Sequence, residues 1–371
     1  MIPIADPDIG EVEKDRVETV MDSGQLADGP EVRTFEREFA SYCGSEHAVA
    51  TTNGTTALHA TLRAFDIGPG DAVITTPFSF IATANAIRLA GATPVFADVE
   101  PLSLTLDPQS VEREMLRRDD VKAILPVHLY GTPAPMHGLR TVADRHDVAL
   151  IEDAAQAHGA TYRGDRVGTI GDAACFSFYP TKNMTAGEGG MVTTDDQSVA
   201  ERVKRFIDHG RTSGYEHATV GHNFRMTSLC AAVGRAQLAK LPEYTHARRS
   251  HAAMLTERLE DTAIETPTEP RDVRSVYHQY TVRTDERDRL ARHLEDRGVE
   301  TGVYYPTPIH QQPAYDDVTG EFPVAERAAD RVLSLPVHPS LSAEDLDTVA
   351  TAVTEFTDAT ARSGGERVVD R

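Results

Sequence analysis

The sequence predicts an α/β protein: a mostly parallel seven-stranded sheet flanked by helices, followed by a smaller C-terminal α+β domain. From about residue 47 to 195, short apolar runs alternate with segments of helical periodicity, which is the pattern of a parallel sheet covered by helices. After about residue 228 the pattern changes to one long helical stretch and then a mixed segment. At 371 residues, the chain also exceeds the size at which one hydrophobic core stops growing.

The seven predicted strands are short runs rich in apolar and β-branched residues. They occupy residues 47–52, 72–76, 94–98, 122–128, 148–153, 173–178 and 190–194. Helical periodicity is found between them at residues 55–65, 80–89, 108–118 and 136–145. The first half of the chain therefore consists of repeated strand–helix units without a repeat in the sequence.

We expect three parts along the chain. An N-terminal helical arm and the large domain occupy residues 1–235, and a small domain occupies residues 236–358. The small domain contains the end of the long helical stretch, a strand near 277–283 and a helix near 288–298. Residues 359–371, with Ser-Gly-Gly and scattered charges, have little to bury and are predicted to form a flexible tail.

The formal net charge of -21 excludes two classes of partner. A strongly acidic protein repels nucleic acid and anionic lipid, so any anion must be bound by a local site. The basic residues are almost all arginine, and the excess of acidic residues suggests adaptation to a salt-rich cytoplasm. An ordinary acidic protein without such adaptation is the alternative.

The cysteines and the N-terminus indicate a cytoplasmic protein. The three cysteines lie far apart without a CxxC motif, which fits a reducing compartment better than a disulfide framework. The N-terminus lacks a signal-peptide pattern, and no apolar run approaches the roughly 18 residues that a membrane span requires.

The first candidate site is residues 52–58, where a strand ends in a turn of small residues and a helix begins. Free backbone amides at a helix N-terminus can bind a phosphate, assisted here by threonine hydroxyls. Threonine and glycine are also good capping residues, so ordinary helix capping is the alternative.

The second candidate is Asp153, at the end of the segment 148–153, which begins with the continuous apolar run 148–151. Such a run predicts a central strand, and open α/β sheets bind ligands at the carboxyl ends of their strands. A carboxylate at that place needs a partner. The alternative is that Asp153 only caps a following helix.

The third candidate is Lys182, one of five lysines in the chain. It follows a predicted buried strand and Pro180, and it precedes the glycine turn at 187–190. This setting suits a partly desolvated amine with a lowered pKa, which is the nucleophile of Schiff-base chemistry. The alternative is a solvated lysine in a loop.

The three candidates together match what pyridoxal phosphate requires: a lysine, an acidic partner for its pyridine nitrogen, and a phosphate cradle. The sequence resembles the DegT/DnrJ family of sugar aminotransferases, which have the aspartate-aminotransferase-like, pyridoxal-phosphate-dependent transferase fold. The resemblance covers roughly residues 20–345. Its motifs lie at residues 54–58, 77–83, 126–131, 152–156, 177–182, 188–190 and 222–226.

This resemblance implies a role for each matching residue. Lys182 corresponds to the lysine that holds the cofactor and moves the proton, and Asp153 to the partner of the pyridine nitrogen. Gln156 corresponds to the residue that binds the cofactor's 3-hydroxyl, and Phe80 to the ring stacked on the pyridine. The implied phosphate ligands are Gly54, Thr55, Thr56 and Ser177.

The resemblance also implies partners. The asparagine that matches Asn223 reaches the phosphate of the neighbouring subunit, so a homodimer with shared active sites is implied. His310 resembles a residue of a sugar-contacting loop, although a loop histidine is more often only solvated. Glu188 matches the glutamate form that 4-amino-sugar producers tend to carry, although inositol-type relatives share it.

We therefore expect a transaminase that takes the amino group of glutamate and transfers it to the 4-keto position of a nucleotide-linked sugar. The alternatives are a 3-keto-sugar aminotransferase, a sugar dehydratase on the same scaffold, or a non-catalytic regulatory protein. Lys182 argues against the dehydratase, because dehydrating relatives replace this lysine with histidine. The sequence contains no HExxH or other recognised ligand spacing, so we expect no metal site.

Overall fold

A computed structural model describes the backbone of residues 1–366 and the side chains through residue 359. Its centre is the predicted seven-stranded sheet, in the order β1-β9-β8-β5-β4-β2-β3. The strands are β1 (His47–Thr51), β2 (Ala72–Thr75), β3 (Thr93–Phe96), β4 (Val121–Leu125), β5 (Ala149–Asp153), β8 (Ala173–Ser177) and β9 (Gly190–Thr194). Each begins within one residue of its predicted start and ends within two residues of its predicted end, except β4, which ends three residues early.

The sheet is mostly parallel, as the sequence predicts. Strands β3, β2, β4, β5 and β8 pair in parallel with their neighbours, and β9 runs antiparallel between β8 and β1. The carboxyl ends of β5 and β8 therefore lie side by side at one edge of the sheet, with Asp153 opposite Cys175.

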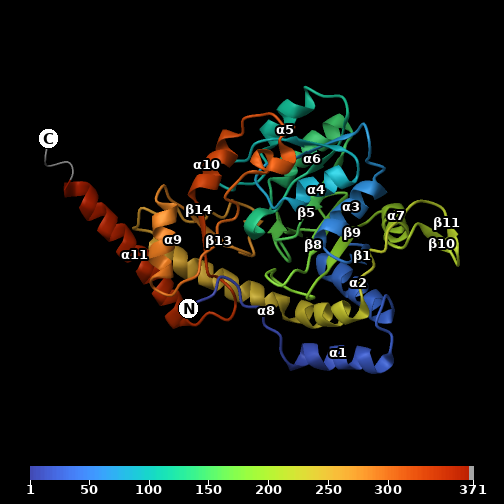
Figure 1. Cartoon of the computed structure of the whole chain (residues 1–371), viewed down its shortest axis with the longest axis horizontal. Coiled ribbons are helices and arrows are strands. Elements are labelled where there is room, and N and C mark those ends of the chain that lie inside the picture. The colour runs from blue at the N-terminus through green and yellow to red at the C-terminus, as the bar shows by residue number, and fades with distance from the viewer. Residues whose placement is uncertain (367–371) are drawn as a thin grey trace.

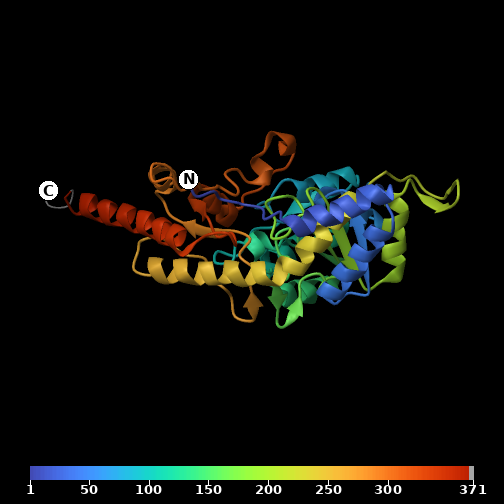
Figure 2. The same cartoon turned by 90° about the horizontal axis from the view of Figure 1, so that it is seen from below.

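Helices cover both faces of this sheet (Figures 1 and 2). They are α3 (Gly54–Ala64), α4 (Ala82–Leu89), α5 (Pro108–Met115), α6 (Met136–His146) and α7 (Gln197–Ile207). Alternate strand residues point to opposite faces. Val73 and Ile151 accordingly pack in one cluster with residues of α3, α4 and α7, while Ile74 and Leu150 pack in another with residues of α5 and α6.

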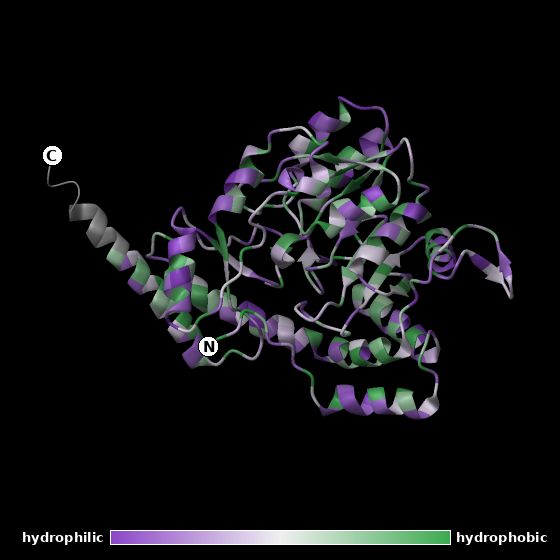
Figure 3. Ribbon diagram, viewed as in Figure 1, coloured by the Kyte–Doolittle hydropathy of each residue, from purple (hydrophilic) through white to green (hydrophobic). Residues whose placement is uncertain are grey.

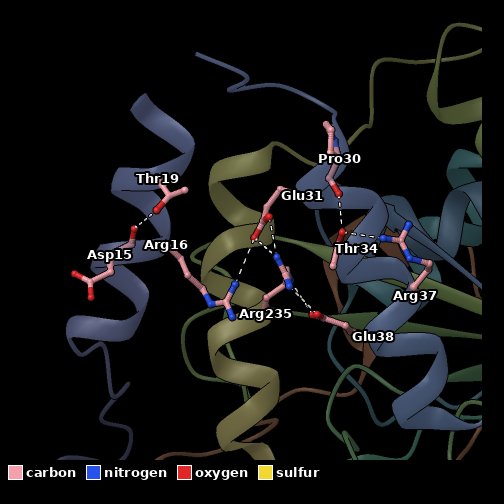
Figure 4. Close-up of polar contacts among 9 residues, drawn as sticks. All are labelled: Asp15, Arg16, Thr19, Pro30, Glu31, Thr34, Arg37, Glu38 and Arg235. Carbon is pink, nitrogen blue, oxygen red and sulfur yellow. Dashed lines mark hydrogen bonds and ion pairs between the residues drawn. The ribbon is translucent and has the colours of Figure 1, made fainter. Parts of the chain in front are cut away.

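The N-terminal arm is helical, as the sequence predicts. Helices α1 (Glu11–Ser23) and α2 (Pro30–Cys43) pack against α8 (Ser228–Leu259), a single helix of 32 residues (Figure 1). Arg235 of α8 donates to the carboxylates of Glu31 and Glu38 on α2 over 2.7–2.8 Å, and Arg16 of α1 lies 3.9 Å from Glu31 (Figure 4).

A second core forms around the far half of α8. It contains the antiparallel pair β13 (Tyr280–Arg283) and β14 (Val332–Leu335), with α9 (Arg287–Glu295) and α11 (Ala343–Glu366) packed on it. Helix α10 (Pro323–Arg331) and the short helices η2 (Ile309–Gln311) and η3 (Pro313–Tyr315) join the two cores. Hydrophilic residues predominate along the outer helices (Figure 3).

The proposed boundary between residues 235 and 236 falls inside α8. Helix α11 continues into the predicted tail, whose last residues, 367–371, lie outside the described part of the chain. Among the described residues, no helix combines the length and hydropathy that a membrane span requires. The remaining short elements are β6 (Thr161–Tyr162), β7 (Asp165–Arg166), β10 (Arg211–Ser213), β11 (Glu216–His217), β12 (Val273–Arg274) and η1 (Leu129–Gly131).

Candidate active site

A cavity of about 590 Å³ lies at the carboxyl end of β5 and β8. Seven of the residues singled out in the sequence line it together: Gly54, Thr55, Phe80, Asp153, Gln156, Ser177 and Lys182. They come from four segments that are far apart along the chain. Because parallel strands end at the same edge of a sheet, the fold gathers these segments in one place.

Lys182 lies in the turn that follows β8, where its backbone amide donates to the carbonyl of Tyr179 over 2.9 Å. Burial lowers the pKa of its amine to about 8, and the nearby carboxylate of Asp153 opposes this shift. A substantial share of the amine is therefore neutral near pH 8. The neutral amine is the form that attacks a carbonyl.

Asp153 is the last residue of β5 and is almost completely buried. Its Oδ2 accepts a hydrogen bond from the hydroxyl of Thr83 at 2.7 Å, and its Oδ1 accepts one from the amide of Ala155 at 3.2 Å. Burial raises the pKa of this carboxyl, against the opposing effects of Thr83, Ala155 and Lys182. A cationic group bound in the cavity would stabilise the charged carboxylate further.

The start of α3 has the geometry of an anion cradle. Asn53 caps the helix by accepting from the amide of Thr56 at 2.9 Å, whereas the amides of Gly54 and Thr55 make no hydrogen bond among the described residues. A Cβ at Gly54 would lie 2.8 Å from the Cβ of Ser177, so only glycine lets α3 approach β8 this closely.

Thr56 is not part of this anion-binding turn. Its amide and its hydroxyl are both engaged with Asn53, the hydroxyl donating to the carbonyl of Asn53 over 2.8 Å. The residue is also absent from the lining of the cavity. At this position the capping alternative fits the structure better than the predicted phosphate ligand.

Gln156 and two aromatic rings also line the cavity. The side-chain oxygen of Gln156 accepts from the amide of Tyr130 at 2.6 Å, and its Nε2 donates to the hydroxyl of Tyr305 over 3.2 Å. Phe80 is 56% exposed, and its ring centroid lies 6.0 Å from that of Tyr305. An exposed aromatic ring at the mouth of a cavity is suited to stacking on a flat ligand.

His310 and Asn223 lie outside this cavity. His310 is buried on η2, where its Nε2 lies 3.1 Å from a carboxylate oxygen of Glu326 and its ring packs edge-on against Phe322. The structure thus turns His310 inward, away from the predicted sugar contact. Asn223 is exposed on the segment between hairpin β10–β11 and α8, and its side-chain oxygen accepts from Arg225.

Several residues that line the site were not predicted, among them Thr83, Tyr305 and His278. Thr83 lies within the motif at 77–83, but nothing in that motif shows that its hydroxyl faces Asp153. Tyr305 and His278 come from loops near residues 305 and 278 and reach the cavity only through the fold. A loop carries no periodicity from which the direction of a side chain can be predicted.

The chain matches the DegT/DnrJ/EryC1/StrS aminotransferase family over residues 7–354. It is 44% identical to the dTDP-3-amino-3,4,6-trideoxy-alpha-D-glucose transaminase of Streptomyces venezuelae, over 91% of this chain and 90% of that protein. It is 40% identical to a UDP-N-acetyl-3-dehydro-alpha-D-glucosamine 3-aminotransferase of Acidithiobacillus ferrooxidans, over 90% of both chains.

Solved structures share this fold. The structure of DesV from S. venezuelae, in complex with a ketimine intermediate, superposes with a TM-score of 0.90 and is 43% identical. The match covers 93% of this chain and 94% of that chain. The resemblance found in the sequence and the predicted fold class are both confirmed.

Proposed function

Because the chain belongs to the DegT/DnrJ/EryC1/StrS aminotransferase family and is therefore a pyridoxal-phosphate-dependent sugar aminotransferase, we propose that its acceptor is a nucleotide-linked 3-keto sugar. We propose glutamate as the amino donor. The observation that carries the proposal is the meeting of Lys182, Asp153 and the start of α3 in one cavity.

The proposed position of amino transfer is C3 and replaces the C4 expectation drawn from Glu188. Several relatives are named as transaminases of 3-amino or 3-oxo nucleotide sugars. Glu188 lines the cavity but is exposed. Its residue type alone is a weak guide to which carbon faces Lys182, because specificity depends on small differences among several contacts.

The residues present fit pyridoxal phosphate. Gly54 and Thr55 offer unengaged amides beside Ser177, which suits a phosphate. Asp153 makes no ion pair among the described residues, which leaves its carboxylate for the pyridine nitrogen. The ring of Phe80 is free to stack, and Gln156 lies within the same cavity.

When bound, pyridoxal phosphate supplies an electron sink for the carbon that gains or loses a proton. The contribution of the protein is to hold and move protons at defined atoms. Lys182 has a pKa near that of an efficient general base, so its amine can accept and return the proton at Nζ. Asp153, whose carboxylate is held by Thr83, would face the pyridine nitrogen and favour its protonated form.

We also propose a homodimer in which Asn223 completes the partner's site. The support is geometric: hairpin β10–β11 projects from the body of the chain, as Figure 1 shows. Tyr215 and Val220 on this segment are 98% and 89% exposed. An isolated chain would leave these side chains, and Asn223 beside them, without a packing surface.

The experiment that tests the function is an absorption spectrum with added pyridoxal phosphate, before and after glutamate. We expect a visible cofactor band that glutamate bleaches and that a nucleotide-linked 3-keto sugar restores. Lys182→Ala should lack the band and turnover, while the exposed Lys122→Ala should behave as wild type. A band that responds to no amino donor, or a Lys182→Ala variant that retains turnover, would contradict the proposal.

A further inference from the structure

Residues 275–279 form a loop that is fixed to the rest of the molecule from several directions. The amide of Val276 donates to the carbonyl of Gly131 at 3.0 Å, and the amide of Gln279 donates to the carbonyl of Tyr130 at 3.3 Å. The side-chain amide of Asn183, next to Lys182, donates to the carbonyl of Val276 at 3.1 Å. The loop is thus tied to two segments that line or adjoin the cavity.

A buried arginine completes this attachment. Arg248 of α8 donates to the carbonyls of Tyr277 and His278, each at 3.3 Å, and has no carboxylate partner among the described residues. Tyr277 has a φ of 42°, a region that residues with side chains rarely occupy. Such a conformation persists only where the surroundings impose it, so the loop has one defined shape.

The loop presents two polar side chains to the cavity, His278 and Gln279. Both residues are more than nine-tenths buried. The side-chain amide of Gln279 makes no hydrogen bond among the described residues, and His278 uses only its Nδ1, which lies 3.2 Å from Oδ1 of Asn183. Buried polar groups normally have partners, so groups left open at a cavity point to a ligand.

The hydrogen bonds of Asn183 decide which nitrogen of His278 carries the proton. Nδ2 of Asn183 donates to Val276, so its Oδ1 is the acceptor facing His278. Nδ1 of His278 must then be the donor, which leaves Nε2 as an acceptor. Burial, together with the nearby Lys182, Arg248 and His158, holds the pKa of His278 well below its usual range, so the ring stays neutral.

From this geometry we infer that His278 is a specificity residue: its Nε2 accepts a hydrogen bond from a hydroxyl of the sugar, with Gln279 as a second polar contact. The inference rests on the proposed sugar aminotransferase function. It adds that the residues His278 and Gln279 contact the hydroxyl groups of the sugar and so distinguish one sugar from another. A site that hydrogen-bonds a hydroxyl rejects the analogue that lacks it, because its own polar atom is then left unpaired.

Two substitutions separate this role from a structural one. The side-chain amide of asparagine reaches the position of Nδ1 of histidine, so His278→Asn can keep the contact with Asn183 while removing the acceptor in the cavity. The longer glutamine reaches the position of Nε2, so His278→Gln keeps the acceptor and gives up the contact with Asn183. The control is His137→Asn, the same change at an exposed position on α6.

Both half-reactions are measured on the cofactor band of the holoenzyme. The probes are glutamate and two stable amino sugars, UDP-3-amino-N-acetylglucosamine and dTDP-3-amino-3,6-dideoxygalactose, which run the sugar half-reaction in reverse. We expect His278→Asn to lower kcat/KM for the amino sugars roughly ten-fold or more beyond its effect on glutamate. His278→Gln should recover most of that loss, and His137→Asn should match wild type.

The opposite order, with His278→Gln more impaired than His278→Asn, would show that the histidine only supports the loop. An equal loss in both half-reactions would also overturn the inference. If the wild-type protein forms no cofactor band, the proposed function fails first. Calorimetric binding of the same two amino sugars then still tests the role of His278. We expect His278→Asn to bind them more weakly than His278→Gln, and equal binding by the two variants would refute the inference.

Discussion

The hydroxyl of Thr83, near the start of α4, donates a hydrogen bond to Oδ2 of Asp153 at the end of β5, over 2.7 Å. Ser79 lies 3.0 Å from the same hydroxyl. Thr83 is therefore the side chain that fixes the direction of the carboxylate. A hydrogen bond to the charged form also favours that form, which opposes the effect of burial.

Replacing Thr83 with valine should weaken the cofactor site without removing it. Valine keeps the shape of threonine but leaves Oδ2 of Asp153 with one donor fewer, a loss of about 1–3 kcal/mol. We expect a correspondingly larger Kd for pyridoxal phosphate, measured by titration of the cofactor band. Thr83→Ser retains the hydroxyl and should restore most of the affinity; equal behaviour of the two variants would contradict this role.

The lowered pKa of Lys182 predicts how fast the apo-protein captures pyridoxal phosphate at different pH values. Only the neutral amine reacts, so the rate should rise with pH through a midpoint of about 8. Stopped-flow absorbance at constant ionic strength measures this rate. A midpoint near the value of an ordinary exposed lysine, about 10.4, would show that the amine is not desolvated.

The Cβ that Gly54 lacks should matter for both stability and phosphate binding. A methyl group there would lie 2.8 Å from the Cβ of Ser177, so Gly54→Ala should lower the free energy of unfolding by about 1–3 kcal/mol. Urea unfolding measures this loss. Adding Ser177→Gly should remove the clash and recover stability, but not affinity for the cofactor. A Gly54→Ala variant as stable as wild type would refute the close approach.

The ion pairs of Arg235 with Glu31 and Glu38 should stabilise the N-terminal helices. Arg235 is partly buried and donates to both carboxylates, so Arg235→Met should cost about 1–3 kcal/mol in urea unfolding. Hydrogen bonding to Arg235 holds the pKa of Glu38 below its usual value. The contribution of the pair is therefore present above the unfolded pKa and is lost as pH falls through the folded pKa.

The difference between wild type and Arg235→Met should accordingly shrink on acidification below about pH 4, the usual pKa of glutamate. Arg37→Met is the control, because Arg37 is exposed on α2, the helix that carries Glu31 and Glu38, and it donates to Thr34 (Figure 4). A loss of similar size in both variants would assign the effect to general surface charge.

The net charge of -21 predicts a dependence on salt. Repulsion among the acidic residues is screened as the ionic strength rises, so we expect a higher Tm in about 2 M KCl than in dilute buffer. Thermal unfolding followed by circular dichroism measures the shift. Equal Tm values in both solutions would argue against adaptation to a salt-rich cytoplasm.

The sequence predicted those parts of the site that depend on local order. Asp153 ends a strand, and Gly54 and Lys182 come within five residues after one. The ends of parallel strands meet wherever the sheet forms. The role of Thr56 could not be predicted from its position after a strand, because a phosphate ligand and a helix-capping residue have the same sequence pattern. His310 was expected at the sugar, but a loop pattern does not show whether a side chain turns inward.

The sequence also could not predict that Thr83, His278 and Tyr305 reach the cavity. Their place in the cavity depends on hydrogen bonds between segments separated by about 70 residues or more, such as that from Thr83 to Asp153. Helical periodicity places Thr83 on a buried face of α4 but does not name its partner. Such partners follow only from the packed structure.

The length of α8 has one further consequence. Near one end, Arg235 ties this helix to the N-terminal helices, and at its middle Arg248 holds the loop that carries His278. The same helix, α8, therefore contacts both the N-terminal helices and the loop that carries His278. If His278 contacts the sugar as inferred, changes in α2 that shift this helix are expected to alter substrate preference as well as stability.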